Sequence, residues 1–276
     1  MEKHFEVLKL NSRDLRSWTL SVLKLYGLKP RKKLSQSFVV DPRLINEVAS
    51  YTEYKDTTEI GCGIGTLSLA IIGKVRSLVC IEIDERLCNV AKSIVKAPNF
   101  IVVCGDATRL ELDGEQLVSN LPYHVTSSIL VKLARQNNIK RAVLTVQREV
   151  GERLTSTPGA KSYGKITVLI KVLFDVKAGN IYPPSSFYPQ PKVYHQVVLL
   201  IRKREYDEYV EVLEKVTKKL FTQRRRIVDK VFENLFKLRL EELGAIGKRV
   251  SGRRIYSLSP QDLLELAIAV RDRGLL

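Results

Sequence analysis

The stretch Glu59-Ile60-Gly61-Cys62-Gly63-Ile64-Gly65 places three glycines at alternate positions directly after a short apolar run. A chain without Cβ atoms at these positions can turn sharply from a strand into a helix and lets a ligand approach the backbone. Thr66 stands where a glycine would complete the dinucleotide-binding pattern G-x-G-x-x-G. The neighbouring sequence is neutral to acidic, so the loop predicts a seat for a nucleoside cofactor that carries no phosphate.

Downstream of residue 55, short apolar runs alternate with helical patterns, which predicts an open, mainly parallel α/β sheet. The runs end at 59–60, 81–84, 103–106, 117–120 and 144–147, and a last run covers 196–201. In such sheets, ligands gather beyond the carboxyl ends of the strands. Four successive runs end in polar side chains, and we expect these to line one crevice: Glu59, Glu82, Asp106 and Asn120.

The flanks of this region have a different pattern. Residues 12–26 show helical spacing, with Ser12 as the expected cap and Gly27 as the stop. Beyond the basic run 202–204, apolar residues recur with a helical period, and Ser259-Pro260-Gln261-Asp262 predicts the start of a last helix. The sequence therefore predicts an N-terminal helical extension over 1–28, the cofactor-binding α/β domain over 29–204 and a small helical domain over 205–276.

The net charge of +16 is unevenly distributed. Residues 51–150 carry 12 basic and 11 acidic side chains, so the excess lies on the flanks. This distribution suits a polyanion gripped around a neutral pocket, although a solvated basic surface has the same composition. The candidate RNA-binding residues are Lys29, Arg31, Lys32 and Lys33 in the linker and Arg224, Arg225 and Arg226 in the tail; for the tail, a solvated helix face is an equally good interpretation.

The apolar runs and the cysteines bear on the compartment. No apolar run approaches the ~20 residues of a membrane span, and the first residues lack the order of a signal peptide. The four cysteines lie inside apolar runs without the paired spacing of a zinc site: Cys62, Cys80, Cys88 and Cys104. We expect a cytoplasmic monomer with reduced core thiols, no membrane partner and no metal.

The turn Asn120-Leu121-Pro122-Tyr123 carries the most specific chemistry. An exocyclic aromatic amine is a poor nucleophile, so a catalyst gains by accepting hydrogen bonds from both of its N–H groups. The Asn120 side-chain oxygen and the Leu121 carbonyl would be those acceptors, Pro122 would stiffen the turn, and Tyr123 would stack on the base. A strand-terminating Asx turn with a buried tyrosine is the alternative for the tetrapeptide alone. Together with the glycine loop, the turn predicts methyl transfer to an adenine amine.

Six motifs, in this order and spacing, make the chain resemble the ribosomal RNA adenine N6-dimethyltransferases, most of all the small-subunit branch of archaeal type. They are Leu34-Ser-Gln36-Ser-Phe38, the glycine loop 59–65, Ile81-Glu82-Ile-Asp84, Gly105-Asp106-Ala107, the turn 120–123 and Phe187-Tyr-Pro-Gln-Pro-Lys-Val193. The resemblance covers roughly residues 30–200 and implies a Rossmann-like methyltransferase fold. It also implies dimethylation of two adjacent adenosines near the 3′ end of small-subunit rRNA, within an assembling ribosomal subunit.

The resemblance assigns the cofactor, S-adenosyl-L-methionine, to a set of residues along the crevice. Its methionine end would contact Gln36, Ser37 and Val39, and its ribose and adenine would contact Glu82, Asp106 and Ala107. The remaining cofactor-binding residues would be Glu59, Gly61, Gly63 and Asn120. The catalytic set would be Asn120, Leu121, Tyr123 and Phe187, with Phe187 stacked on the target adenine from a proline-stiffened loop rather than packed in the core.

Two departures from the family pattern stand out. Ser35 and Ser37 replace the usual glycine and asparagine of the first motif, and Tyr194-His195 follows Val193 where a serine or threonine usually follows soon after. We interpret His195 as a strand residue rather than a catalyst. Two rival functions stay open: adenine methylation of large-subunit rRNA or DNA, and a non-catalytic RNA-binding assembly factor with the same fold.

Overall fold

The computed structural model describes residues 10–275, so the first part of the expected N-terminal extension lies outside the described residues. The chain divides into two compact units. The first contains the residues up to 151 together with 177–201, and the second contains 152–176 together with the residues from 202 onward. The division differs from the expected boundary near 204, because the segment 152–176 groups with the C-terminal helices rather than with the sheet.

The first unit is built on a seven-stranded sheet in the order β4-β3-β2-β5-β6-β9-β7. Its strands, in chain order, are β2 (Asp56–Ile60), β3 (Ser77–Glu82), β4 (Phe100–Cys104), β5 (Gln116–Asn120), β6 (Arg141–Gln147), β7 (Phe174–Tyr182) and β9 (His195–Arg202). The strands β2 to β6 are mutually parallel, and β9 runs antiparallel to β6. The predicted α/β fold is confirmed, and each expected strand end falls within two residues of an observed one.

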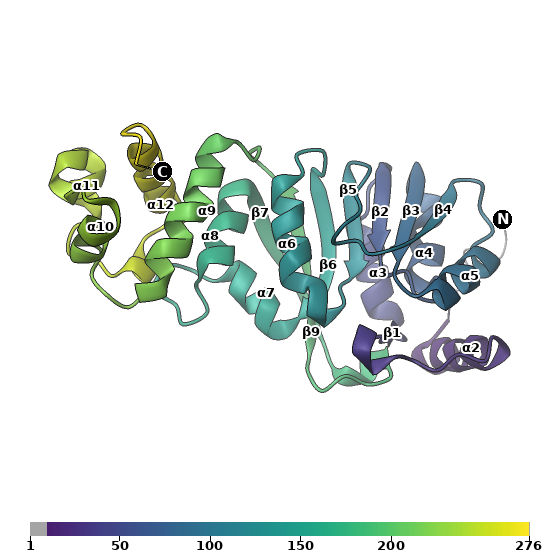
Figure 1. Cartoon of the computed structure of the whole chain (residues 1–276). Helices are drawn as coiled ribbons and strands as arrows, with labels where there is room; N and C mark the ends of the chain where they lie inside the picture. Colours follow the sequence, from purple (N-terminus) through teal and green to yellow (C-terminus); the bar gives the residue numbers. More distant parts are fainter. Residues whose placement is uncertain (1–9, 276) are drawn as a thin grey trace. The chain divides into compact units, whose positions relative to one another are not determined.

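Three helices connect parallel strands as crossovers: α4 (Thr66–Ile71) between β2 and β3, α5 (Glu85–Ile94) between β3 and β4, and α6 (Thr126–Arg135) between β5 and β6. α3 (Pro42–Tyr51) precedes β2, and α7 (Arg148–Thr155) follows β6. Figure 1 shows α6 in front of the sheet and α4 behind it, as expected when the direction of strand addition reverses between β2 and β5. That reversal is the topological switch point, and it places the ends of β2 and β5 beside a crevice.

Capping residues explain where several helices begin. Asp41 accepts a hydrogen bond from the Arg43 amide at the start of α3, and Asp84 accepts one from the Arg86 amide at the start of α5. In α2 (Ser12–Leu25) the cap is Asn11, whose side chain accepts from the Asp14 amide at 3.0 Å. The expected cap, Ser12, is therefore wrong by one position.

A short two-stranded ribbon was not foreseen from the sequence. β1 (Phe38–Val39) pairs antiparallel with β8 (Phe187–Tyr188). The ribbon joins the first family motif to the last one, across about 150 residues of chain. Phe187 consequently packs in the apolar core of the sheet domain, together with Leu44, Val143 and Val197.

The second unit is helical, as predicted. Its helices are α8 (Lys165–Leu173), α9 (Glu208–Leu220), α10 (Val228–Phe236), α11 (Ala245–Val250) and α12 (Pro260–Arg271), and α8, α9 and α12 pack on one another. The predicted start of the last helix is confirmed, because Ser259 and Asp262 form a capping box. Across residues 10–275, every helix is too short or too polar to span a bilayer.

The cysteines correct one expectation from the sequence. Cys62 pairs with Cys80 and Cys88 pairs with Cys104, and the Cα atoms are 6.0 Å apart in each disulfide. Reduced thiols were expected because the cysteines are far apart in sequence and lie in apolar runs. The fold instead brings each pair together: Cys62, in the glycine loop after β2, meets Cys80 on β3, and Cys88, on α5, meets Cys104 at the end of β4.

Candidate active site

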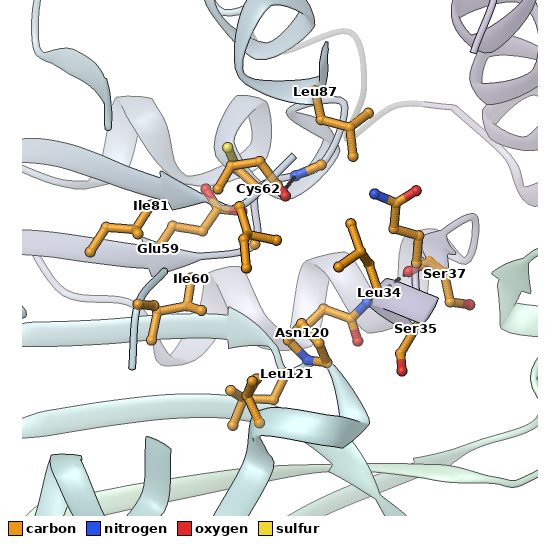
Figure 2. A pocket seen from close by; sticks show the side chains of 18 of the residues that line it. Leu34, Ser35, Ser37, Glu59, Ile60, Cys62, Ile81, Leu87, Asn120 and Leu121 are labelled. Carbon is orange, nitrogen blue, oxygen red and sulfur yellow. Dashed lines mark hydrogen bonds between the residues drawn. The ribbon is translucent and has the colours of Figure 1, made fainter. Parts of the chain in front are cut away.

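A single pocket lies beyond the carboxyl ends of β2, β3, β4 and β5, with a volume of about 990 Å³ including its open mouth. Figure 2 shows Glu59, Cys62 and Ile81 on one side of it, and Leu34, Ser35 and Ser37 on another. All the expected cofactor-binding residues line this pocket: Gln36, Ser37, Val39, Glu59, Gly61, Gly63, Glu82, Asp106, Ala107 and Asn120. Leu121 and Tyr123 line it as well, whereas Phe187 does not.

The glycine loop has the backbone conformation for which glycine is needed. Gly61, Gly63 and Gly65 have φ values of +72°, +58° and +84°. A Cβ atom at Gly63 would also lie 3.0 Å from the Phe38 ring. Any other residue at 63 would therefore be strained and crowded, so the loop depends on glycine for both its turn and its fit.

Glu82 anchors the glycine loop from the neighbouring strand. Its carboxylate accepts hydrogen bonds from the Gly63 amide at 2.9 Å and the Asp84 amide at 3.0 Å. The side chain is buried, and burial raises the pKa of Glu82 above its ordinary value. A carboxylate in this position suits the two hydroxyls of a ribose, which would donate to it.

Glu59 lies beneath the same loop and is also buried. The Ser68 hydroxyl donates a hydrogen bond to its carboxylate. Complete burial raises the pKa of Glu59 to about 8, and the nearby charge of Glu82 acts in the same direction. At neutral pH Glu59 is therefore largely protonated, which distinguishes it from an ionised ligand for a sulfonium or an amine.

Asp106 also lines the pocket and is more exposed than Glu59 and Glu82. The hydroxyl and the amide of Thr108 donate to it at 2.7 and 2.8 Å, and these bonds hold the pKa of Asp106 below its ordinary value. Asp106 is therefore ionised and suited to accept a hydrogen bond from an adenine amine. Together with Glu82 and the glycine loop, it forms a donor and acceptor set that fits S-adenosyl-L-methionine. Among residues 10–275, no group of three His, Cys, Asp or Glu side chains is placed to hold a metal ion.

The turn Asn120-Leu121-Pro122-Tyr123 follows β5 directly. The Asn120 side-chain nitrogen donates to the Ser37 carbonyl at 2.9 Å, and Figure 2 shows the amide directed at this segment. This hydrogen bond fixes which way the amide faces, and the side-chain oxygen of Asn120 can still accept a hydrogen bond. The Leu121 amide donates to the Thr145 carbonyl at 3.0 Å, which fixes the turn to the adjacent strand β6.

The segment 34–39 is held by side chains that were expected to bind the cofactor. The Gln36 side chain donates to Asp84 at 2.8 Å and accepts from the Arg31 amide at 2.7 Å. The Ser37 hydroxyl donates to the Pro189 carbonyl at 2.8 Å. Both side chains therefore position the wall of the pocket, and their contact with the cofactor stays a prediction.

Phe187 is placed differently from the expectation. It is only 1% exposed and belongs to the core, so the expected loop position is wrong. The neighbouring prolines do not keep the segment out of packed structure, because Phe187 opens strand β8. Its ring contacts His195, with centroids 4.3 Å apart, and the His195 ring contacts Tyr123 at 5.4 Å.

The expected RNA-binding residues fall into two groups. Lys29, Lys32 and Lys33 are exposed, as is Arg31, which also lies 3.6 Å from Asp84. Arg225 and Arg226 are exposed as well. Arg224 is half-buried; its guanidinium donates to the Lys161 carbonyl at 2.9 Å and lies over the Tyr256 ring. Arg224 is thus engaged within the helical unit, unlike the two arginines that follow it.

Sequence reasoning missed several residues that line the pocket. Ile83 directly follows Glu82, lines the pocket and is 46% exposed. The sequence does contain a signal for Ile83, because it is an apolar residue between two acids, Glu82 and Asp84, at the end of a strand. An apolar side chain in such a position offers a surface on which a flat ring can pack. Leu87, Thr108 and Val125 line the pocket without any comparable signal.

Comparisons with known proteins agree with this geometry. Residues 27–267 match the family model of the ribosomal RNA adenine dimethylases. The probable ribosomal RNA small subunit methyltransferase A of Pyrobaculum aerophilum is 35% identical over 238 residues, which is 86% of this chain and 96% of that protein. The ribosomal RNA small subunit methyltransferase A of Natranaerobius thermophilus is 33% identical over 257 residues, covering 82% of this chain and 85% of that protein.

Two solved structures share the fold. A dimethyladenosine transferase from Plasmodium falciparum superposes with a TM-score of 0.74 at 22% identity, covering 86% of this chain and 98% of that one. The 23S rRNA methyltransferase ErmE gives a TM-score of 0.67 at 23% identity, covering 85% and 99%. With the family model spanning nearly the whole described chain, the protein belongs to the ribosomal RNA adenine dimethylase family and is an S-adenosyl-L-methionine-dependent methyltransferase.

Proposed function

We propose that the protein dimethylates the N6 amines of two adjacent adenosines near the 3′ end of small-subunit rRNA, on assembling subunits in the cytoplasm, and acts as a monomer. The observation that carries the chemistry is the orientation of Asn120, whose side-chain nitrogen is used by Ser37 and whose oxygen remains an acceptor at the pocket. The names of the small-subunit relatives from Pyrobaculum and Natranaerobius support the choice of RNA.

The residues of the turn supply positioning and electrostatics rather than a strong base. The Asn120 oxygen and the Leu121 carbonyl accept from the two N–H groups of the amine and favour its tetrahedral form. S-adenosyl-L-methionine supplies a methyl group already activated by its sulfonium. Because that leaving group is so reactive, correct alignment of the amine accounts for most of the required rate.

The RNA would be gripped outside the pocket. Lys29, Lys32 and Lys33 are exposed and immediately precede the segment 34–39 that walls the pocket. Phosphates bound there would present a splayed adenosine to the turn 120–123, where Tyr123 lines the opening and would stack on the base.

Transfer of tritiated methyl groups tests the proposed substrate. Unmethylated small subunits, large-subunit rRNA and duplex DNA are compared, and the product is digested to nucleosides. Dimethyladenosine formed only in small subunits is the expected result. Labelling of large-subunit rRNA or DNA instead would replace the proposed substrate, and no labelling of any of them would favour the non-catalytic assembly factor.

Asn120→Ala tests the chemistry under single-turnover conditions with saturating RNA and cofactor. We expect the methylation rate to fall by ~10²-fold or more while RNA affinity changes little, because the interaction forms mainly in the transition state. Asn89→Ala, on an exposed position of α5, is the matched control. A near wild-type rate in Asn120→Ala would exclude the amine clamp.

A further inference from the structure

His195 contacts both aromatic residues that were expected to enclose the target base. Its ring centroid lies 5.4 Å from that of Tyr123, with 32° between the planes, and 4.3 Å from that of Phe187, with 46° between the planes. Among the described residues, no ring contact joins Tyr123 to Phe187 directly. The imidazole therefore connects a residue of the pocket to a residue of the core.

The position of His195 is fixed by the sheet. It opens β9, pairs with Gln147 at the end of β6 and is 1% exposed. Burial lowers the pKa of His195 to about 4, so the ring is neutral at neutral pH. A neutral ring anchored at a sheet position does not swing aside as a loop residue would, which makes it a rigid support.

Tyr123 depends on such a support because of where it lies. It opens a short 3-10 turn after Pro122, and it lines the pocket with one part of its surface. Its hydroxyl is buried without a hydrogen-bond partner, so no polar contact of that group fixes the ring. Packing against His195 is therefore the ring contact that sets the plane of Tyr123.

We infer that His195 is a positioning residue of the target-base pocket, which holds the Tyr123 ring in the plane that stacks on adenine, and that Phe187 acts on the base only through His195. This inference rests on the proposed function, because it assumes that an adenine enters beside Tyr123. In this arrangement Phe187 does not stack on the base; it packs against His195, which in turn packs against Tyr123.

The test uses the full-length protein and small-subunit RNA with 2-aminopurine at the target adenosine, whose fluorescence reports unstacking and capture of the base. His195→Ala should weaken capture by about three- to tenfold, the size of an aromatic pair contact. His195→Phe, which keeps a ring, should restore most of it, and His195→Asn, which keeps polar nitrogen without a ring, should not. Restoration by Asn but not by Phe would overturn the inference.

A double-mutant cycle separates a relay from two independent contacts. If Phe187 acts through His195, the double variant of His195→Ala and Phe187→Ala should lose no more capture than the worse single variant. Additive losses would show that Phe187 meets the base itself and would overturn the inference. Phe232→Ala, in the core of the helical unit, controls for general loss of packing and should leave capture unchanged.

Two measurements keep this test independent of the proposed function. Calorimetric binding of S-adenosyl-L-methionine shows that each variant is folded around the pocket, and it should not change in His195→Ala or His195→Phe. Wild-type methylation of the matched RNA, which has adenosine and therefore an N6 amine at the target position, tests the proposed function alone. Active wild-type enzyme with an unaffected His195→Ala variant would refute the inference only, whereas inactive wild-type enzyme would refute the proposed substrate.

Discussion

Glu59→Gln should remove a large part of the pH dependence of stability. The folded-state pKa of Glu59 is about 8, against an ordinary value of 4.5. Because the pKa of Glu59 is higher in the folded state than in the unfolded state, its protonation favours the native state. This stabilisation is fully present below about pH 4.5 and is lost as the pH rises through about 8. Between pH 6 and pH 9 the free energy of unfolding therefore falls by about 3 kcal/mol, since each of the two pKa units between pH 6 and pH 8 corresponds to about 1.4 kcal/mol.

Denaturant unfolding followed by circular dichroism at pH 6 and pH 9 measures this effect. Glutamine keeps the size of the side chain and an oxygen that accepts from Ser68, but it does not titrate. The free energy of unfolding of Glu59→Gln, relative to wild type, should therefore rise by about 3 kcal/mol from pH 6 to pH 9. Glu85→Gln, at an exposed position of α5, should show no such change.

The comparison separates Glu59 from Glu82, the other buried acid whose pKa is raised. Burial also raises the pKa of Glu82, and that contribution has the same sign, but it is present in both wild type and Glu59→Gln. A difference between the two proteins that stays constant across the pH range would refute the buried, protonated state of Glu59. The glycine loop would then rest on an ionised carboxylate.

Three further changes test the pocket, the RNA surface and the disulfides. Glu82→Ala should weaken cofactor binding by ~1.5–3 kcal/mol in calorimetry with little change in RNA affinity, and unchanged cofactor affinity would refute the ribose site. RNA affinity should fall steeply with salt, and charge reversal at Lys32 and Lys33 should reduce it more than the same change at Lys92 and Lys96; equal effects would favour a solvated basic surface. Reduction of the disulfides should lower the free energy of unfolding by about 3 kcal/mol for each bridge, given sequence separations of 18 and 16 residues, and thiol counting in denaturant without reductant should find no free thiol.

The sheet and most of the pocket were predictable because both depend on local patterns. Apolar runs of strand length, each followed by a polar residue, place Glu59, Glu82 and Asn120 at the same edge once the strands are parallel. The glycine loop adds a conformational requirement that favours glycine over other residue types, and its three positive φ values confirm it. In both cases the deciding information lies within a few residues of the site.

The features that were not predicted depend on contacts distant in sequence. Prolines beside Phe187 indicated a stiff loop, but the burial of its ring follows from pairing with β1, which no local pattern reveals. The disulfide of Cys88 and Cys104 joins helix α5 to the end of β4, so it follows from the packing of that helix on the strand, which no local pattern reveals. Edge strand β7 contains Gly179 and alternates poorly, so its sequence lacks the signal of a strand.

Ser37 shows how such distant contacts complete the site. Its carbonyl accepts from Asn120 and its hydroxyl donates to the Pro189 carbonyl, so one residue connects the turn 120–123 to the segment that carries Phe187. The hydrogen bond to Ser37 fixes which way the Asn120 amide faces, with its nitrogen toward the Ser37 carbonyl and its oxygen free to accept. The orientation of the proposed acceptor therefore requires the segment 34–39 in place, and this segment also walls the pocket. The proposed cofactor site and the proposed amine clamp share this wall, so a change that loosens the segment should impair both.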